Sequence, residues 1–215
     1  MRITAVIASV RKRNIVIPGV LLLTLLALIS LFRLPAMADL SEINGDSKQI
    51  VTASWQRGEV IAVLRHLERC DRVDAPCLRG PEGVTARAQK VASALAVDFS
   101  MLGLGNADIY HSPAQRTAET SELLFVGSGE ARDWLLDCKK EDALYNRALK
   151  EKKAGRNLIL VTHSSCIEEF EESLGHSSDT PDYAATLFLV NTDSSKNSDL
   201  LGFVDANDWQ LVFGW

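Results

Sequence analysis

Two short apolar runs in the chain each end in a histidine, and this repeated pattern constrains the fold more than any other feature. The run "EVIAVL" precedes Arg65 and His66, and the run "LILV" precedes Thr162 and His163. Short continuous apolar runs that alternate with helical patterns are typical of the buried strands of a parallel sheet. Polar groups at the end of such a strand cost free energy unless something there binds them.

Helical and extended patterns alternate along the rest of the chain. The segment "TARAQKVASALAVDF" has Val91, Leu95 and Phe99 at four-residue spacing, which predicts a helix. A short strand is expected over 108–110, and helices are expected in "AQRTAETSELLF", in "EDALYNRALKEKKAG" and directly after His163. The run "YAATLFLV" predicts another buried strand, and the tail "LLGFVDANDWQLVFGW" predicts a closing hairpin. Strands that alternate with helices predict an α/β domain with a mainly parallel sheet.

The first segment differs from the rest in composition. Residues 15–32 contain no charge and follow a basic cluster at 11–13, and Ala-Met-Ala at 36–38 has the small-x-small form of a signal-peptidase site. The apolar run is long for a signal peptide and short for a membrane span, so cleavage after Ala38, which we favour, and an uncleaved inner-membrane anchor are alternatives. Both export the rest of the chain to the periplasm. We expect three parts: the export segment 1–38, a polar lead-in 39–57 and a folded domain 58–215.

The exported part is strongly acidic. Residues 39–215 carry 18 Lys and Arg against 28 Asp and Glu, a net charge of −10, because residues 1–38 hold five basic residues and no acidic ones. Such a charge disfavours nucleic acid as a partner and disfavours adhesion to anionic lipid. An anionic substrate therefore needs a local basic pocket.

The chain contains four cysteines, an even number, which in an exported protein indicates disulfides. We expect the pairs Cys70–Cys77 and Cys138–Cys166, worth roughly 2.5 and roughly 3.6 kcal/mol in the chain-entropy model. A zinc site is the alternative, but no CxxC or HxxxH spacing supports it. We therefore expect no metal.

Three of the expected strands deliver polar side chains to one edge of the sheet. In a doubly wound sheet, functional groups gather just beyond the carboxyl ends of the strands. Guanidinium forks bind phosphate oxygens in pairs, so several arginines beside two histidines predict a pocket for a tetrahedral dianion. The side chains concerned are Arg65, His66, Arg69, His111, Ser112, Arg116, Thr162 and His163.

The motifs "RHLER", "SPAQRTAET" and "VTHSS", in this order, resemble those of the histidine phosphatase superfamily, the phosphoglycerate-mutase-like enzymes. Within it, "LRHLERCDRVDAPCL", "LLDCKKEDALY", "LILVTHSSCI" and "PDY" are most similar to periplasmic heptose-phosphate phosphatases of the lipopolysaccharide core. The similarity covers most of the chain from about Glu59 onward. It implies a three-layer fold, with helices on both faces of a mainly parallel central sheet.

The resemblance also implies a mechanism and roles for individual residues. His66 would attack phosphorus as a neutral imidazole and become a phosphohistidine. Arg65, Arg116 and His163 would hold the phosphoryl oxygens, and Arg69, which matches the second arginine of RHxxR members, would add a donor. His111 and Ser112 are candidate substrate contacts. Water would then hydrolyse the intermediate without a metal or other cofactor.

The leaving alkoxide needs a proton from a carboxylic acid. In many members the acid follows the second histidine, but here serines follow His163, and the resemblance points to Glu141, with Glu68 and Asp142 as alternatives. Leu67 also departs from the pattern, because the family normally has Gly or Ala there. It would either crowd the pocket or pack beneath it.

The pocket and the export segment together predict an exported, metal-independent phosphomonoesterase. Its substrate would be a sugar phosphate, either a small molecule or part of lipopolysaccharide, and most specifically a core heptose phosphate. The membrane would be reached only through residues 15–32, and the sequence indicates no oligomeric state. The alternatives are a broad-specificity phosphatase or phosphohistidine phosphatase of the same fold, and a phosphate-binding envelope protein without turnover.

Overall fold

The computed structural model describes residues 34–43, 46–127, 129–138, 144–177, 180–192 and 198–215. Ala36–Trp215 form one compact unit, and the fold is that of this unit. The apolar run 15–32 of the predicted export segment 1–38 lies outside the described residues. Among those that are described, no helix has both the length and the apolar composition needed to cross a membrane.

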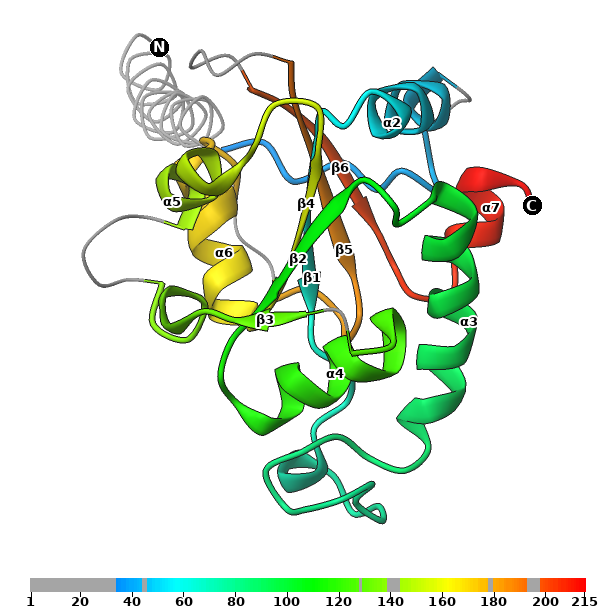
Figure 1. Ribbon diagram of the computed structural model, residues 1–215, viewed down its shortest axis with the longest axis vertical. Helices are drawn as coiled ribbons and strands as arrows, with labels where there is room; N and C mark the ends of the chain where they lie inside the picture. The colour runs from blue at the N-terminus through cyan, green and yellow to red at the C-terminus, as the bar shows by residue number, and fades with distance from the viewer. Residues whose placement is uncertain (1–33, 44–45, 128, 139–143, 178–179, 193–197) are drawn as a thin grey trace, which may run out of the picture. The chain divides into compact units, whose positions relative to one another are not determined.

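In the described part of the chain, six strands form one sheet in the order β3-β2-β4-β1-β5-β6 (Figure 1). The pairs from β3 to β1 are parallel, whereas β5 and β6 are antiparallel to their neighbours. The predicted α/β fold with a parallel centre is therefore confirmed, with an antiparallel edge added. The strands are β1 (Val60–Arg65), β2 (Ala107–His111), β3 (Glu130–Ala131), β4 (Asn157–Thr162), β5 (Thr186–Asn191) and β6 (Ser198–Val204).

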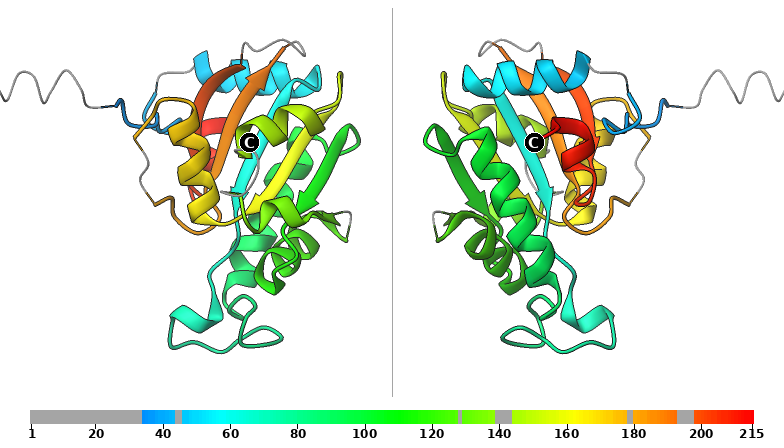
Figure 2. Two further views of the ribbon diagram at one scale, coloured as in Figure 1. Left: turned by 90° about the vertical axis from the view of Figure 1, so that its left-hand side faces the viewer. Right: turned by 90° about the vertical axis from the view of Figure 1, so that its right-hand side faces the viewer.

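Helices cover both faces of the sheet and complete three layers. One face is covered by α5 and α6, and the other by α2, α3, α4 and α7, as the two side views of Figure 2 show. Two 3-10 turns, η1 (Cys70–Arg72) and η2 (Asp133–Leu135), lie in the connections. The helices are α2 (Asp46–Gln56), α3 (Ala88–Leu102), α4 (Gln115–Phe125), α5 (Leu144–Glu151), α6 (Ser164–Ser173) and α7 (Trp209–Phe213).

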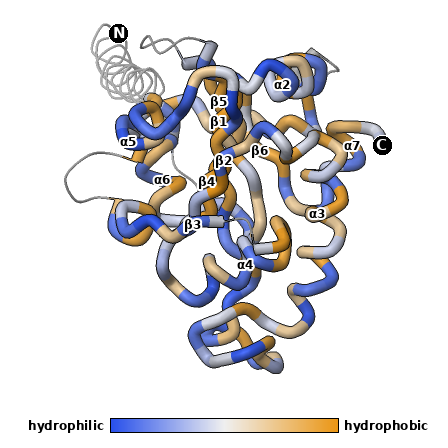
Figure 3. Tube along the Cα trace, in the orientation of Figure 1, coloured by the Kyte–Doolittle hydropathy of each residue, from blue (hydrophilic) through white to orange (hydrophobic). Residues whose placement is uncertain are grey.

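The strand β1 shows why the sheet centre is a continuous apolar run. Successive side chains of a strand point to opposite faces. Val60, Ala62 and Leu64 therefore pack into the core under α2, α3 and α7, while Ile61 and Val63 pack into the core under α5 and α6. Because both faces are buried, no polar residue is tolerated until the strand ends, and the apolar colour is continuous along the central strands in Figure 3.

The predicted hairpin at the end of the chain is wrong in its second half. The strand β6 does pair with β5, but it is followed by the helix α7. Trp209, Val212 and Phe213 lie three and four residues apart and are buried, as expected of one helix face. Trp209 packs against Phe99 and Phe188, with ring centroids 4.6 and 5.8 Å away. An apolar run this short fits a strand and a helix equally well.

The polar lead-in at 39–57 is part of the fold rather than an appendage. It contains α2, whose Val51 and Trp55 are buried in the core, and the Trp55 indole N–H donates to the Gly103 carbonyl over 2.7 Å. Asn157 joins this helix to the sheet: its amide donates to the Trp55 carbonyl over 2.8 Å and accepts from the Val60 N–H over 3.0 Å. The sequence interpretation missed this helix because only two of its residues are core aliphatic or aromatic side chains.

Candidate active site

The register of two parallel strands brings the two predicted histidines together. In the β1–β4 pair Arg65 lies opposite Thr162, and the His66 N–H donates to the Thr162 carbonyl over 3.0 Å. His66 and His163 are therefore the next residues on neighbouring strands. Their ring centroids lie 5.5 Å apart and the rings meet edge to face.

The His66 ring is buried and held in one tautomer. Its Nδ1 lies 2.7 Å from the Leu67 carbonyl oxygen, which can only accept, so Nδ1 carries the proton and Nε2 keeps its lone pair. The pKa of His66 is lowered to about 3: burial is the largest cause, the neighbouring His163, Arg116 and Arg65 act in the same direction, and the bond to Leu67 opposes them. The imidazole is therefore neutral at physiological pH, the form that a nucleophile requires.

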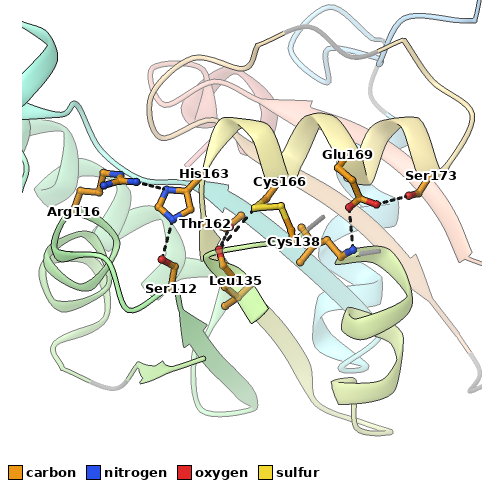
Figure 4. The surroundings of a disulfide bond; sticks show 10 residues. Ser112, Arg116, Leu135, Cys138, Thr162, His163, Cys166, Glu169 and Ser173 are labelled. Carbon is orange, nitrogen blue, oxygen red and sulfur yellow. Dashed lines mark hydrogen bonds between the residues drawn. A yellow bond between two sulfur atoms is a disulfide. The ribbon is translucent and has the colours of Figure 1, made fainter. Parts of the chain in front are cut away.

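His163 is held from both sides (Figure 4). The Arg116 guanidinium donates from Nη2 to its Nδ1 over 3.1 Å, so the neutral ring carries its proton on Nε2, which lies 2.8 Å from the buried Ser112 hydroxyl. Burial lowers the pKa of His163 to about 4, with Arg116 and Arg69 contributing. The structure therefore places Ser112 behind His163, as a residue that orients the ring.

Two arginines present buried donors at this edge of the sheet. The Arg65 guanidinium donates to the Pro181 carbonyl and lies 4.0 Å from the centre of the Tyr183 ring. The Nε groups of Arg65 and Arg116 are buried without a hydrogen-bond partner among the described residues. Burial lowers the pKa of both arginines. Unpaired buried donors are uncommon in proteins, and an anion would satisfy them.

Arg69 lies close to the two histidines, but its side chain already has a partner. The guanidinium forms an ion pair with Asp71 through both Nε and Nη2, and Asp71 raises the pKa of Arg69. Its charge nevertheless contributes to lowering the pKa of His163 and of Arg116. Arg69 therefore adds positive potential to the pocket and would have to leave Asp71 to donate to a ligand.

The carboxylic acid expected for proton transfer is not among the described residues. Glu141 and Asp142 both lie outside them. Glu68, the other alternative, accepts two 2.6 Å hydrogen bonds from Arg87 and one of 2.8 Å from the Thr85 hydroxyl. The Arg87 guanidinium lowers the pKa of Glu68, so Glu68 is ionised at neutral pH and is a poor proton donor.

The residues on either side of the Glu141 segment are both attached to α6. Cys138 forms a disulfide with Cys166 in the first turn of this helix, and the Leu144 N–H donates to the Glu169 carboxylate over 2.9 Å (Figure 4). Because α6 begins directly after the second histidine, these attachments keep both ends of the segment on the helix that leads away from the pocket.

Both predicted disulfides are present in the structure. Cys70–Cys77 closes the loop that follows the first arginine-histidine motif, and Cys138–Cys166 connects the η2 region to α6. Both are local connections within the unit, and both stand at the carboxyl ends of the parallel strands that form the pocket.

His111 and Leu67 take no part in the contacts between the histidines and arginines. The His111 ring is half-buried, and its Nδ1 lies 2.7 Å from the Ser112 carbonyl. Leu67 is 1% exposed and belongs to the core under α3, and its N–H donates to the Thr120 hydroxyl over 3.0 Å. It therefore packs beneath the pocket rather than crowding it.

Tyr183 is a site residue to which the sequence interpretation assigned no role. Its ring centroid lies 5.7 Å from that of His66, and the ring faces the Arg65 guanidinium. Tyr183 precedes β5, and because β5 is antiparallel to β1, the amino end of β5 lies at the same edge as the carboxyl end of β1. The available signal was the "PDY" motif before a buried strand, but its position depends on a strand direction that the sequence does not specify.

Solved structures share this fold and place it among the phosphoglycerate-mutase-like folds. The protein histidine phosphatase SixA, complexed with tungstate, matches with a TM-score of 0.53 and 14% identity over 69% of this chain and 98% of that chain. A phosphoglycerate mutase from Bacillus anthracis matches with a TM-score of 0.50 and 17% identity over 73% of this chain and 97% of that chain. The predicted fold class is thereby confirmed.

Curated proteins with similar sequences include several named lipopolysaccharide core heptose(II)-phosphate phosphatase. The protein from Salmonella arizonae is 27% identical over 151 residues, which are 70% of this chain and 73% of that protein. The protein from Salmonella typhimurium is 28% identical over the same shares. No family model matches the chain. These similarities confirm the resemblance to histidine phosphatases and to the heptose-phosphate phosphatases among them.

The depressed pKa values of the two histidines predict a pH-dependent stability. As the pH falls below 6.5, the unfolded chain takes up protons on these imidazoles before the folded chain does, so the free energy of unfolding falls by up to about 1.4 kcal/mol per pH unit for each. Between pH 7 and pH 5, wild type should lose up to about 2 kcal/mol more than His66→Gln, as measured by urea unfolding. Equal losses in the two proteins would contradict the buried neutral imidazole.

Proposed function

We propose that the chain is an exported, metal-independent phosphomonoesterase that uses His66 as its nucleophile and acts on a heptose phosphate of the lipopolysaccharide core. One observation carries this proposal. The lone pair of His66 Nε2 is available beside the His163 ring, and two arginines at the same edge of the sheet have buried Nε donors without a partner among the described residues. A phosphoryl group supplies what each of these groups lacks: an electrophile for the imidazole and acceptor oxygens for the guanidinium groups.

The reaction would proceed in two balanced steps. In the first, His66 Nε2 bonds to phosphorus, the P–O ester bond breaks, and the leaving oxygen takes a proton from Glu141. In the second, a water oxygen attacks phosphorus, the P–N bond breaks and returns its electron pair to His66 Nε2, Glu141 accepts the proton from water, and inorganic phosphate leaves. Arg65, Arg116 and His163 would stabilise the equatorial oxygens throughout, and Arg69 would strengthen the positive potential.

His163 changes its hydrogen bonding in this scheme. In the free site its Nδ1 accepts from Arg116. A bound dianion favours the charged imidazole and raises the pKa of His163, so Nδ1 then donates to a phosphoryl oxygen. Ser112 continues to accept from Nε2–H and keeps the ring in place. The hydrogen bonds that hold the free site therefore also orient the donors for the bound state.

The export and substrate proposals have support of their own. Two disulfides suit an oxidising compartment outside the cytoplasm. The similar Salmonella proteins are named for a lipopolysaccharide core substrate. The export segment, by cleavage or as an anchor, would place this chain in the periplasm, where such a sugar phosphate is reached.

Loss of the nucleophile tests the proposed function. The purified protein should release nitrophenol from p-nitrophenyl phosphate in the presence of EDTA, and His66→Ala should lower kcat by at least about a thousandfold because no other group can form the intermediate. His176→Ala removes a histidine from a loop outside the pocket and should retain the wild-type rate. Comparable activity in His66→Ala and wild type would refute the mechanism.

The proposed role of Glu141 predicts a dependence on the leaving group. Nitrophenolate leaves without a proton, whereas a sugar alkoxide does not. Glu141→Gln should therefore lower kcat/KM for a sugar phosphate by about a hundredfold or more and change the rate on p-nitrophenyl phosphate only slightly. Asp142→Asn, the adjacent matched variant, should leave both rates near wild type. If Asp142→Asn shows the selective loss instead, the acid is Asp142.

A further inference from the structure

A second feature at this edge of the sheet is a cavity of about 300 Å³, whose lining includes Leu67, the residue after His66. We call it the side cavity. Helix α3 forms one wall, and the turn between β6 and α7 contributes to another. It is lined by Leu67, Glu68, Arg87, Ala88, Lys90, Val91, Tyr183, Ala184, Ala206 and Asn207.

The side cavity adjoins the phosphate pocket through Tyr183. This side chain lines the cavity and also contacts the pocket, where its ring faces Arg65 and lies 5.7 Å from the His66 ring. Leu67, which lines the cavity as well, follows His66 in the chain. The side cavity and the histidine–arginine cluster therefore share Tyr183.

The chemistry of the lining suits a carbohydrate. The aromatic ring of Tyr183 and aliphatic side chains such as Val91 and Ala206 offer apolar surface to the C–H face of a sugar ring. Arg87, Lys90 and Asn207 supply polar groups for hydroxyls or acidic substituents. A few polar groups around an apolar surface are typical of small-molecule sites.

The charge of the lining suits an anionic carbohydrate in particular. Glu68 is the only carboxylate in the lining and is neutralised by its paired hydrogen bonds with Arg87, which leaves Lys90 as the excess charge. The lining is therefore net positive on a domain whose residues 39–215 carry a net charge of −10. A polyanionic saccharide is repelled by most of this surface and attracted here.

We propose that the side cavity is a saccharide subsite, which binds the part of an anionic oligosaccharide substrate that lies beyond the phosphate ester, with Tyr183 as the residue that separates the two subsites. This rests on the proposed function, because it assigns a place to the rest of that substrate. In-line attack by His66 expels the ester oxygen away from the imidazole. The subsite therefore receives a more distant portion of the oligosaccharide rather than the atoms bonded to phosphorus.

Filling the cavity tests the subsite. Val91→Trp places a large side chain in it from α3, and Val97→Trp makes the same change on the same helix at a position that is 59% exposed and outside the lining. For phosphorylated core oligosaccharide, kcat/KM should fall about tenfold or more in Val91→Trp and stay at the wild-type value in Val97→Trp. For p-nitrophenyl phosphate, which does not reach the cavity, both variants should match wild type.

A binding measurement separates this inference from the proposed function. Calorimetry with dephosphorylated core oligosaccharide should show binding to wild type and Val97→Trp and a loss of about tenfold or more in affinity with Val91→Trp, whether or not the protein is an active phosphatase. Lys90→Gln, which leaves the cavity open, should weaken binding and provides the test if Val91→Trp does not fold. Equal oligosaccharide binding and turnover in wild type and these lining variants would overturn the subsite. Absence of turnover with binding retained would overturn only the proposed function.

Discussion

The register between β1 and β4 is the constraint on which the rest of the site depends. Parallel pairing of Arg65 with Thr162 places the next residue of each strand, His66 and His163, side by side, and the hydrogen bond from His66 N–H to the Thr162 carbonyl extends the pairing to the histidine itself. A slip of one residue would turn every side chain of the strand to the opposite face. Because both faces of β1 are packed, the core that stabilises the fold also maintains the separation of the two imidazoles.

Burial has two effects at this site, and both prepare it for the phosphoryl group of the proposed function. It lowers the pKa of both histidines, so both imidazoles are neutral at neutral pH, and it shields the guanidinium Nε donors from bulk water. The unpaired Nε groups of Arg65 and Arg116 are unfavourable in the free protein. In the proposed function, a bound phosphoryl group would accept from these donors and remove that cost, so they would favour binding of the anion.

The sequence predicts the parts of the site that depend on strand ends. Apolar runs with a sharp polar boundary locate His66 and His163, and their meeting requires only that the strands be parallel neighbours. The even number of cysteines indicates disulfides but allows three pairings, and the structure confirms the pairing that we expected. Tyr183 was harder to predict because β5 runs antiparallel, so its amino end, rather than its carboxyl end, contributes to the pocket. The direction of a strand is decided by tertiary packing and leaves no local pattern.

Contacts between charged side chains explain most of the remaining differences between the roles predicted from the sequence and those in the structure. Nothing in the spacing of Glu68 and Arg87 indicates that they form a paired contact, yet this contact makes Glu68 a poor proton donor and offsets its charge in the lining of the side cavity. The ion pair of Arg69 with Asp71 likewise changes the expected role of that arginine. The helix α7 was predicted as a strand because a five-residue element is too short for its periodicity to be distinctive.

The central claim is that His66 carries the phosphoryl group during the reaction. The most direct measurement is mass spectrometry of the enzyme quenched at alkaline pH during turnover of a sugar phosphate, with the modified peptide sequenced. The account predicts one added phosphoryl group on the peptide that contains His66, and none when His66 is replaced by Ala. Turnover by wild type with no phosphorylated peptide, or with phosphate on His163 instead, would contradict it.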